Sequence, residues 1–234
     1  MRDLSTIAKE MLEGADSTAK PLPYYSVYQQ YFSNISDDRL KILEIGTYEG
    51  VSTKIFSRFF KNSTIVAIDL ITRDIDFSQF DNVVYLKADQ TDENALLSIC
   101  DKYASDGFDI VIDDASHFGF YSLCSFRVLF PRLRNGGYYV VEDWGTGYWN
   151  DWPDGHQSSP VRFAKYSKVW KKGYPRRIIT HDYGMVGFIK FLVDEVAGLD
   201  NRPSMNSKPT KTAEIEYMHL YHFLAILKKK HRVK

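Results

Sequence analysis

The sequence predicts an α/β fold in which helices cover both faces of a mostly parallel, doubly wound sheet. Five short apolar runs rich in β-branched residues alternate with segments of helical period between residues 40 and 143. Such runs are typical of parallel strands buried on both faces, and their alternation with helices predicts right-handed βαβ units. The segment EIEYMHLYHFLAILKKK predicts two more strands that turn near Tyr221 into an antiparallel hairpin.

Each element has its own signal in the sequence. The predicted parallel strands are KILEIG, TIVAIDL, NVVYLKAD, FDIVIDD and GGYYVVED. Helices are predicted at VSTKIFSRFF, ENALLSICDKYA, FYSLCSFRVLFPRL, VRFAKYSKVWKKG and HDYGMVGFIKFLVDEVAGL. Before them, LSTIAKEMLEG predicts a small amphipathic helix that ends at Gly14, and an aromatic-rich stretch from about Tyr24 to Ile35 predicts a second helix that packs in the core or forms a lid. We therefore expect an N-terminal helical segment at 1–36 and one globular domain at 37–234.

Composition excludes several classes of protein. A hydrophobic content of 44% fills a core and rules out a wholly disordered chain, while 30 basic and 30 acidic residues leave no charge that favours nucleic acid or membrane. No apolar run approaches the roughly 20 residues that cross a bilayer, and the N-terminus lacks a signal peptide's apolar core. A cytoplasmic protein is expected, with reduced Cys100 and Cys124; a homo-oligomer is left open.

Acidic residues end every predicted parallel strand. The carboxyl ends of such strands meet along one edge of the sheet, where ligands bind near the reversal of strand order. Carboxylates gathered at one rim need a compensating cation. After the last of these strands, GTGYWNDWPDGHQSSP predicts a long loop over the rim, a candidate substrate lid. The acids are Glu44, Asp69, Asp89, Asp113 with Asp114, and Glu142 with Asp143.

A glycine turn follows the first strand in LEIGTYEG. Gly46 and Gly50 let the backbone approach a ligand closely. Dinucleotide enzymes carry a glycine where this chain has Glu44, and an acid there repels a pyrophosphate but suits the cationic S-adenosylmethionine. Asp69 is placed to accept ribose hydroxyls, although a strand-end acid is often only a helix cap. The candidate cofactor residues are Glu44, Gly46, Thr47, Tyr48, Gly50, Ser52, Asp69, Leu70, Asp89, Gln90 and Asp113.

These motifs carry a family resemblance. From about Tyr24 to Trp149 the chain resembles class I S-adenosylmethionine-dependent methyltransferases, and among them the metal-dependent sugar O-methyltransferases of the macrocin and mycinamicin type. The match rests on LEIGTYEGVS, KADQTD, FDIVIDDASH, LFPRLRNGGYYVVED and TGYW, in this order. Ala115 stands where the family commonly has glycine, and the chain after Asp151 matches only loosely. The resemblance implies a Rossmann-like methyltransferase fold.

The resemblance also implies a chemistry. Asp114, Glu142 and Asp143 would hold Mg²⁺ or another divalent cation, which favours oxygen ligands. Asp114 and His117 would be catalytic, with His117 as the general base that takes the acceptor's proton, because an imidazole accepts protons near neutral pH. The alternative is a His117 that only bonds to backbone. Asp113 is left undecided between a cofactor contact and a helix cap.

The function predicted is Mg²⁺-dependent O-methylation of a sugar hydroxyl, on a glycoside or a nucleotide-linked sugar, with S-adenosylmethionine as methyl donor. Tyr148, Trp149 and His156 are candidate substrate contacts, although loop packing would explain the aromatic residues equally well. One alternative is a nicotinamide-dependent sugar-modifying enzyme, which the missing G-x-G-x-x-G and Tyr-x-x-x-Lys patterns disfavour. Another is a non-catalytic binding subunit that retains the fold. The acceptor itself is not predicted.

Overall fold

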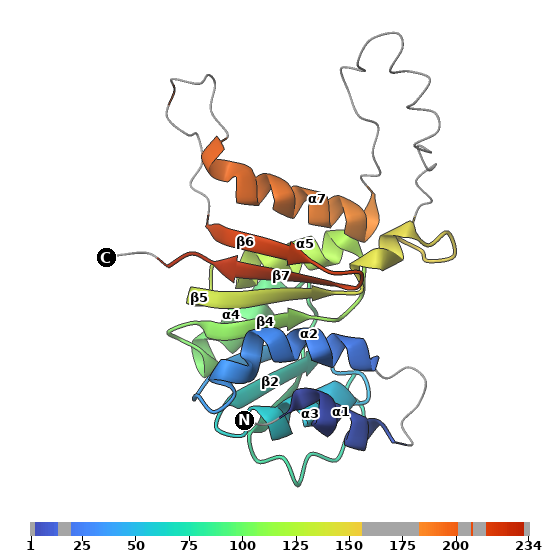
Figure 1. Ribbon diagram of the computed structural model, residues 1–234, viewed down its shortest axis with the longest axis vertical. Coiled ribbons are helices and arrows are strands. Elements are labelled where there is room, and N and C mark those ends of the chain that lie inside the picture. The colour runs from blue at the N-terminus through green and yellow to red at the C-terminus, as the bar shows by residue number, and fades with distance from the viewer. Residues whose placement is uncertain (1–2, 14–19, 156–182, 201–206, 208–213, 232–234) are drawn as a thin grey trace.

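The computed structural model describes residues 3–13, 20–155, 183–200, 207 and 214–231. Its centre is a seven-stranded sheet in the order β3-β2-β1-β4-β5-β7-β6 (Figure 1). Strands β1 to β5 pair in parallel, whereas β7 is antiparallel to both β5 and β6, which confirms the predicted fold class. The strands are β1 (Lys41–Ile45), β2 (Thr64–Asp69), β3 (Val83–Lys87), β4 (Phe108–Asp113), β5 (Leu133–Glu142), β6 (Ile215–Leu220) and β7 (Leu224–Lys229).

Helices cover both faces of this sheet and complete three layers (Figure 1). One face carries α1 (Leu4–Leu12), α2 (Leu22–Phe32) and α3 (Val51–Phe59). The other carries α4 (Glu93–Tyr103), α5 (Gly119–Leu129) and α7 (Gly184–Val196). Short 3-10 helices are η1 (Ser33–Ile35), η2 (Trp144–Tyr148) and η3 (Ala197–Asp200). Among the described residues, no helix has the length and apolar character needed to cross a bilayer.

Alternation along the strands divides the core in two. In β4, Ile110 and Ile112 join the cluster under α1, α2 and α3, while Val111 joins the cluster under α4, α5 and α7. Successive side chains of a strand point to opposite faces, so a continuous apolar run is needed to bury both. The aromatic side chains of α2, including fully buried Tyr25 and Phe32, pack against the sheet. The helices within 1–36 are therefore part of the core.

Several local predictions are refined by the structure. The aromatic helix begins at Leu22, after Pro21 as its N-cap, and passes into η1 after Phe32. The segment after β5 begins with the 3-10 helix η2, where only a loop was predicted. The predicted hairpin is formed by β6 and β7, and both cysteines are free thiols. The predicted basic helix VRFAKYSKVWKKG and the candidate His156 lie outside the described residues.

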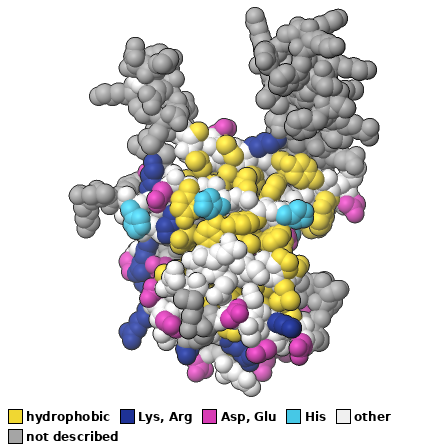
Figure 2. Space-filling model, in the orientation of Figure 1, with side chains coloured by type: hydrophobic (Ala, Val, Ile, Leu, Met, Phe, Trp, Pro, Cys, Tyr) yellow, Lys and Arg dark blue, Asp and Glu magenta, His cyan; other side chains and the backbone are white. Residues whose placement is uncertain are grey.

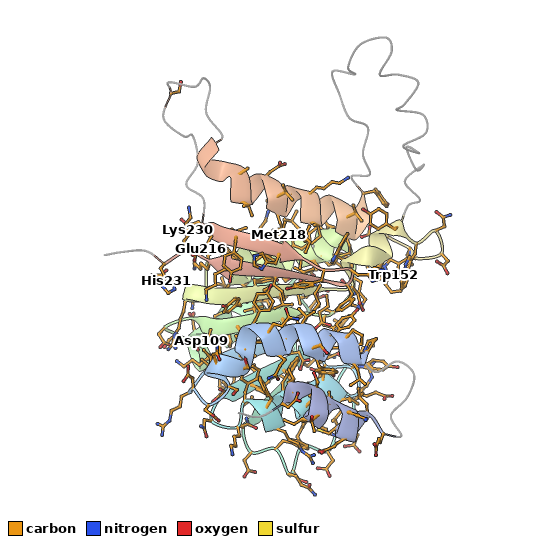
Figure 3. The ribbon with its side chains drawn as sticks, in the orientation of Figure 1. Asp109, Trp152, Glu216, Met218, Lys230 and His231 are labelled. Carbon is orange, nitrogen blue, oxygen red and sulfur yellow. The ribbon has the colours of Figure 1, made fainter. Side chains whose placement is uncertain are left out.

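The two ends of the parallel strands differ in character. Trp152 lies at the carboxyl end of the strands and Asp109 at the opposite end (Figure 3). At that opposite end, Asp109 accepts hydrogen bonds from the guanidinium of Arg134 and the backbone amide of Lys41. On the face shown in Figure 2, hydrophobic side chains form a band while acidic and basic ones are interspersed around it, as the balanced net charge suggests. The carboxyl end holds the candidate site.

Candidate metal and cofactor site

Two adjoining cavities, each of about 450 Å³, open at the carboxyl ends of the strands. We call the first the acid cavity; its walls include Lys20, Tyr24, Asp114, His117, Glu142, Asp143 and Trp152. We call the second the glycine-turn cavity; its walls include Asp69, Leu70, Ala88, Asp89, Gln90 and Ser116. Gly46, Tyr48, Asp114 and Ala115 line both. The strand order reverses between β1 and β4, so the cavities lie where a doubly wound sheet binds ligands.

Unusual backbone conformations concentrate around the acid cavity. Among the described residues, the non-glycine residues with positive φ are Tyr48 at 48°, His117 at 54° and Asp143 at 52°. All three line this cavity. A left-handed conformation costs an L-residue about 1–3 kcal/mol and persists where the surrounding structure enforces it, often at functional sites. The fold therefore strains its backbone at the three places that aim side chains into the acid cavity.

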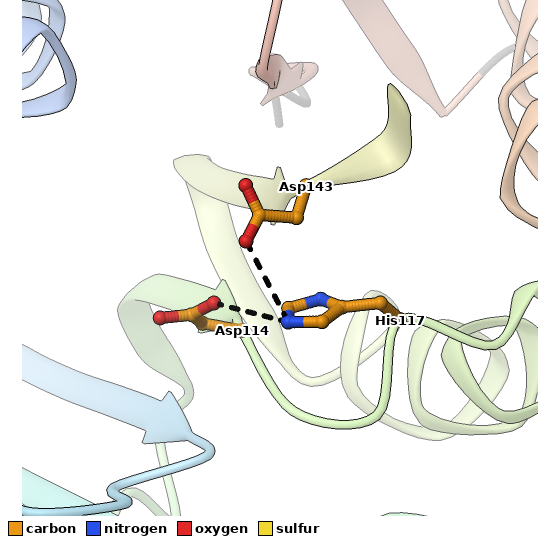
Figure 4. Close-up of side chains that lie close together, drawn as sticks. All are labelled: Asp114, His117 and Asp143. Atoms are coloured by element: carbon orange, nitrogen blue, oxygen red, sulfur yellow. Dashed lines mark ion pairs between the residues drawn. The ribbon is translucent and has the colours of Figure 1, made fainter. Parts of the chain in front are cut away.

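Asp114, His117 and Asp143 form a compact cluster in the acid cavity (Figure 4). The Nε2 atom of His117 lies 3.9 Å from Oδ1 of Asp114 and 3.6 Å from Oδ2 of Asp143. One ligand atom from each of the three residues lies within 4.8 Å of the others. The strand-end arrangement predicted from the sequence thus brings the residues that directly follow β4 and β5 to one point, while the third predicted metal ligand, Glu142, is not part of this compact cluster.

His117 lies in the loop before α5 and is held in place by the segment after β5. The His117 carbonyl accepts hydrogen bonds from Nε1 of Trp152 at 3.1 Å and from the Thr146 hydroxyl at 3.5 Å. The Trp152 ring also packs beside the imidazole, with ring centres 6.0 Å apart. These contacts fix the backbone of His117 from the segment after β5, which leaves its side chain directed toward the two carboxylates (Figure 4).

Helix α2 and Lys20, which precedes its N-cap Pro21, contribute three functional groups that the sequence-based prediction missed. The Lys20 ammonium pairs with Glu142 Oε1 and, at 3.2 Å, with Asp114 Oδ2. The Tyr24 hydroxyl donates to Asp143 Oδ1, and the Tyr28 hydroxyl donates to Glu142 Oε1. Tyr24 and Tyr28 lie one turn apart on α2 and so share a side of the helix, while Lys20 lies just before its N-cap. That spacing was the available signal, but nothing local showed that this side meets the strand ends.

Burial and charge act against each other in this cluster. Burial, together with the charge of Asp114, raises the pKa of Glu142 to about 8, although Lys20 and Tyr28 act to lower it. Burial alone would lower the pKa of Lys20, but Asp114 and Glu142 outweigh it and raise that pKa well above the ordinary value. Burial also raises the pKa of Asp143, and Lys20 offsets part of that effect. Buried carboxylates with this electrostatic imbalance favour an additional cation.

The residues present fit a divalent cation. Glu142 is 1% exposed, and its Oε2 atom has no hydrogen-bond partner among the described residues. A buried carboxylate oxygen without a partner is costly, and a metal ion would satisfy it. With the ion in place all three carboxylates can stay ionised, and their three negative charges balance the Lys20 ammonium and one divalent ion. Hard oxygen donors from separate loops suit Mg²⁺.

The glycine turn after β1 is held by its own acids. The Asp69 carboxylate accepts from the backbone amides of Tyr48 and Ile71, at 2.8 and 2.9 Å. Glu44 is fully buried and accepts from the hydroxyls of Ser52 and Thr53, so it anchors the start of α3. These bonds fix the loop that separates the two cavities.

The predicted cofactor residues fall into three groups. Those that line the glycine-turn cavity are Gly46, Tyr48, Asp69, Leu70, Asp89 and Gln90. Thr47 and Ser52 line the acid cavity, as do Gly46 and Tyr48. Neither cavity is lined by Glu44, Gly50 or Asp113. Residues of the first two groups are therefore placed to contact a ligand. Residues of the third group hold the surrounding structure in place without lining a cavity.

Asp113 points away from the site and into the core. Its carboxylate is 2% exposed and accepts from the Ser125 hydroxyl at 2.8 Å, with Tyr139 and Gln90 at 3.3 and 3.4 Å. It therefore packs against the middle of α5 and does not cap that helix, whose N-cap is Phe118. Gln90 in turn accepts from the backbone amide of Ser116, so this network supports the loop that carries Asp114 and His117.

The aromatic substrate candidates lie outside the cavities. Tyr148 and Trp149 are 43% and 56% exposed at the end of η2, and neither lines the acid cavity. Trp152 lines it instead. In the described part of the chain, Trp152 is thus the tryptophan placed to contact an acceptor.

Gly46 gives a testable prediction for this site. Gly46 has φ of +94°, and an added Cβ would lie 2.0 Å from the carbonyl oxygen of Asp114. We expect Gly46→Ala to displace the Asp114 loop, to destabilise the fold by about 3 kcal/mol and to weaken ligand binding in both cavities. Thermal unfolding and titration calorimetry with S-adenosylmethionine measure these effects. The matched control is Gly145→Ala, where a Cβ meets only the His222 carbonyl at 3.7 Å; equal effects of both changes would refute this role of Gly46.

The chain is similar in sequence to known O-methyltransferases. The chain is 28% identical over 210 residues to demethylmacrocin O-methyltransferase of Streptomyces fradiae, covering 86% of this chain and 47% of the relative. It is 30% identical over 216 residues to 8-demethyl-8-alpha-L-rhamnosyl tetracenomycin-C 2'-O-methyltransferase of Streptomyces olivaceus, covering 88% and 50%. No family model matches the chain. The chain therefore spans about half the length of the curated relatives it matches.

A solved structure is similar over nearly the whole chain. It is the MycE methyltransferase from the mycinamycin biosynthetic pathway, in complex with Mg and SAH. The TM-score is 0.75 at 26% identity, covering 98% of this chain and 55% of MycE. The fold of the chain is that of a class I methyltransferase. Its homologues are sugar O-methyltransferases of the macrocin, mycinamicin and tetracenomycin type.

Proposed function

We propose that the protein transfers a methyl group from S-adenosylmethionine to a sugar hydroxyl with the help of a divalent cation. The observation that carries this proposal is the junction of the two cavities at Gly46 and Asp114. A methyl donor in the glycine-turn cavity would present its reactive end to the acid cavity. An acceptor hydroxyl there would lie among the carboxylates and His117, as displacement at a methyl carbon requires.

The named relatives support the chemical class of the acceptor. The tetracenomycin relative is named for a rhamnosyl substrate, and MycE has been solved with Mg, SAH and mycinamycin VI. We propose a glycoside or a nucleotide-linked sugar as the acceptor for this chain. A cytoplasmic location and the number of subunits stay predictions.

Asp114, Glu142 and Asp143 would hold the divalent cation. When bound, such an ion supplies positive charge that lowers the pKa of a nearby hydroxyl and makes its proton easier to remove. Residues of the chain supply the remaining chemistry. The carboxylates fix the position of the acceptor, and Trp152 offers an aromatic surface beside it.

His117 would take the proton. Its Nε2 atom is farther from both carboxylates than an ordinary hydrogen bond, at 3.6 and 3.9 Å, so it is free to accept. The acceptor oxygen gives its proton to Nε2 and forms a bond to the methyl carbon as the carbon–sulfur bond breaks. The sulfur keeps that electron pair, and S-adenosylhomocysteine leaves as a neutral thioether. His117 then releases the proton to water.

The test separates this function from its competitors. Titration calorimetry should show that the protein binds S-adenosylmethionine and S-adenosylhomocysteine, and that it does not bind NAD. NAD binding without S-adenosylmethionine binding would favour a nicotinamide enzyme and overturn the proposal. Tight S-adenosylmethionine binding without methyl transfer to any glycoside or nucleotide sugar would indicate a binding subunit.

A further inference from the structure

Helix α2 and Lys20 just before it together contact every carboxylate of the proposed metal site, on one oxygen of each. Tyr24 donates to Oδ1 of Asp143, while His117 faces Oδ2 of the same side chain at 3.6 Å. Lys20 lies 3.2 Å from Oδ2 of Asp114, while His117 faces Oδ1 at 3.9 Å.

Glu142 follows the same division. Its Oε1 atom receives both Lys20 and Tyr28, and its Oε2 atom has no hydrogen-bond partner among the described residues. A carboxylate held at one oxygen cannot rotate freely, so its other oxygen keeps a fixed direction. Lys20, which precedes α2, and Tyr24 and Tyr28 of α2 therefore hold three carboxylates in place and leave one oxygen of each available.

We propose that Lys20, Tyr24 and Tyr28 are positioning residues that orient the metal-binding carboxylates and stay in place when the ion is bound. The inference rests on the proposed function, because it assigns the site to a divalent cation. Hydrogen bonds behind the ligands of a metal site direct those ligands, and their loss typically weakens metal binding or activity about 10- to 100-fold.

The charge balance favours a Lys20 that remains beside the bound ion over a Lys20 that the ion displaces. Three carboxylates, one ammonium and one divalent ion sum to zero, whereas removal of the ammonium leaves one negative charge uncompensated. The Lys20 side chain is 5% exposed and lies over the rings of Phe56 and Tyr28, 5.4 and 5.6 Å from the ring centres. Its surroundings hold the ammonium without the metal ion.

The tyrosines allow a test that changes no charge. Mn²⁺ is the probe, and its free concentration is measured by electron paramagnetic resonance during titration of the whole protein. We expect Tyr24→Phe and Tyr28→Phe each to weaken Mn²⁺ binding about 10- to 100-fold. S-adenosylmethionine affinity should stay unchanged, because neither tyrosine lines the glycine-turn cavity.

Tyr25 supplies the matched control on the same helix. It is fully buried like Tyr28, but its hydroxyl has no hydrogen-bond partner among the described residues. Tyr25→Phe should therefore leave Mn²⁺ affinity unchanged.

Wild-type Mn²⁺ affinity in Tyr24→Phe and Tyr28→Phe, or an equal loss of affinity in Tyr25→Phe, would overturn the inference. A wild-type protein that binds no Mn²⁺ would instead overturn the proposed function. If Tyr28→Phe fails to fold, the Mn²⁺ affinity of Tyr24→Phe tests the inference alone, because the ring at position 24 still stacks on Phe223.

Lys20 is tested in the wild-type protein by amine acetylation and mass spectrometry, with and without saturating Mg²⁺. Lys20 should stay protected in both conditions, as should buried Lys229, whose ammonium donates to three backbone carbonyls. Exposed Lys87 should react in both. If Mg²⁺ makes Lys20 reactive while Lys229 stays protected, the ion displaces Lys20, and its place in the proposal is wrong.

Discussion

Replacing His117 with alanine is expected to lower the rate of methyl transfer about 10²- to 10⁴-fold, which is the usual contribution of a general base. The acceptor hydroxyl would then lose its proton only to water. Affinity for S-adenosylmethionine should be unchanged, because His117 does not line the glycine-turn cavity. Steady-state kinetics over a range of pH measure the first effect and calorimetry the second.

His222→Ala is the matched control, since His222 is exposed in the turn between β6 and β7. It should keep wild-type rates. The cluster of Asp114, His117 and Asp143 also permits His117 to be a metal ligand. In that case His117→Ala would lower Mg²⁺ affinity together with the rate, and added Mg²⁺ would restore activity. That outcome would contradict the role of His117 as general base but would be consistent with the proposed metal site.

Replacing Asp114 with asparagine should have the second large effect. We expect Mg²⁺ affinity to fall at least about 100-fold and methyl transfer to drop by a similar factor at limiting Mg²⁺, because one charged oxygen ligand is lost. Asp114 lines both cavities, so a smaller loss of S-adenosylmethionine affinity is expected as well. Mg²⁺ titrations monitored by activity and by calorimetry report the two quantities separately.

Glu216→Gln provides the control for Asp114→Asn, since Glu216 is an exposed acid on the edge strand β6. It removes the same charge far from the cavities and should change neither Mg²⁺ affinity nor rate. An Asp114→Asn protein that is folded and keeps wild-type Mg²⁺ affinity would exclude Asp114 as a ligand. Asp143→Asn should follow Asp114→Asn in Mg²⁺ affinity but not in S-adenosylmethionine affinity.

The rim of acids was predictable from the sequence because it follows from strand periodicity. An apolar run such as FDIVIDD must be buried on both faces, and parallel strands bring their carboxyl ends to one edge. Asp114 and Asp143 therefore meet in the structure as expected, with His117 between them. The class of fold followed from the same pattern.

Roles within the rim were harder to predict. Asp113 and Asp114 are neighbours at the end of β4, yet Asp113 bonds to Ser125 in the core while Asp114 lines the cavities. Alternation predicts that the two point in different directions, but the direction that leads to the core depends on where α5 packs. The same holds for Glu44, which anchors α3 through Ser52 and Thr53.

Contacts from α2 and from Lys20 before it could not be predicted from local patterns. Lys20 and Tyr28 reach Glu142 across 122 and 114 residues of sequence, and Tyr24 reaches Asp143 across 119. Periodicity identifies the helix and its aromatic side, but the choice of partner depends on how α2 docks against the sheet. The exposed positions of Tyr148 and Trp149 likewise depend on the course of η2, which the loop composition did not indicate.

The proposed function is metal-dependent methyl transfer to a sugar. The direct measurement incubates the protein with S-adenosylmethionine, Mg²⁺ and a panel of glycosides and nucleotide-linked sugars, followed by mass spectrometry of the acceptors. A mass increase of one methyl group on a sugar, lost with EDTA and restored by excess Mg²⁺, is the result expected. Methylation that proceeds equally with EDTA, or its absence from every sugar while a non-sugar hydroxyl is methylated, would contradict the account.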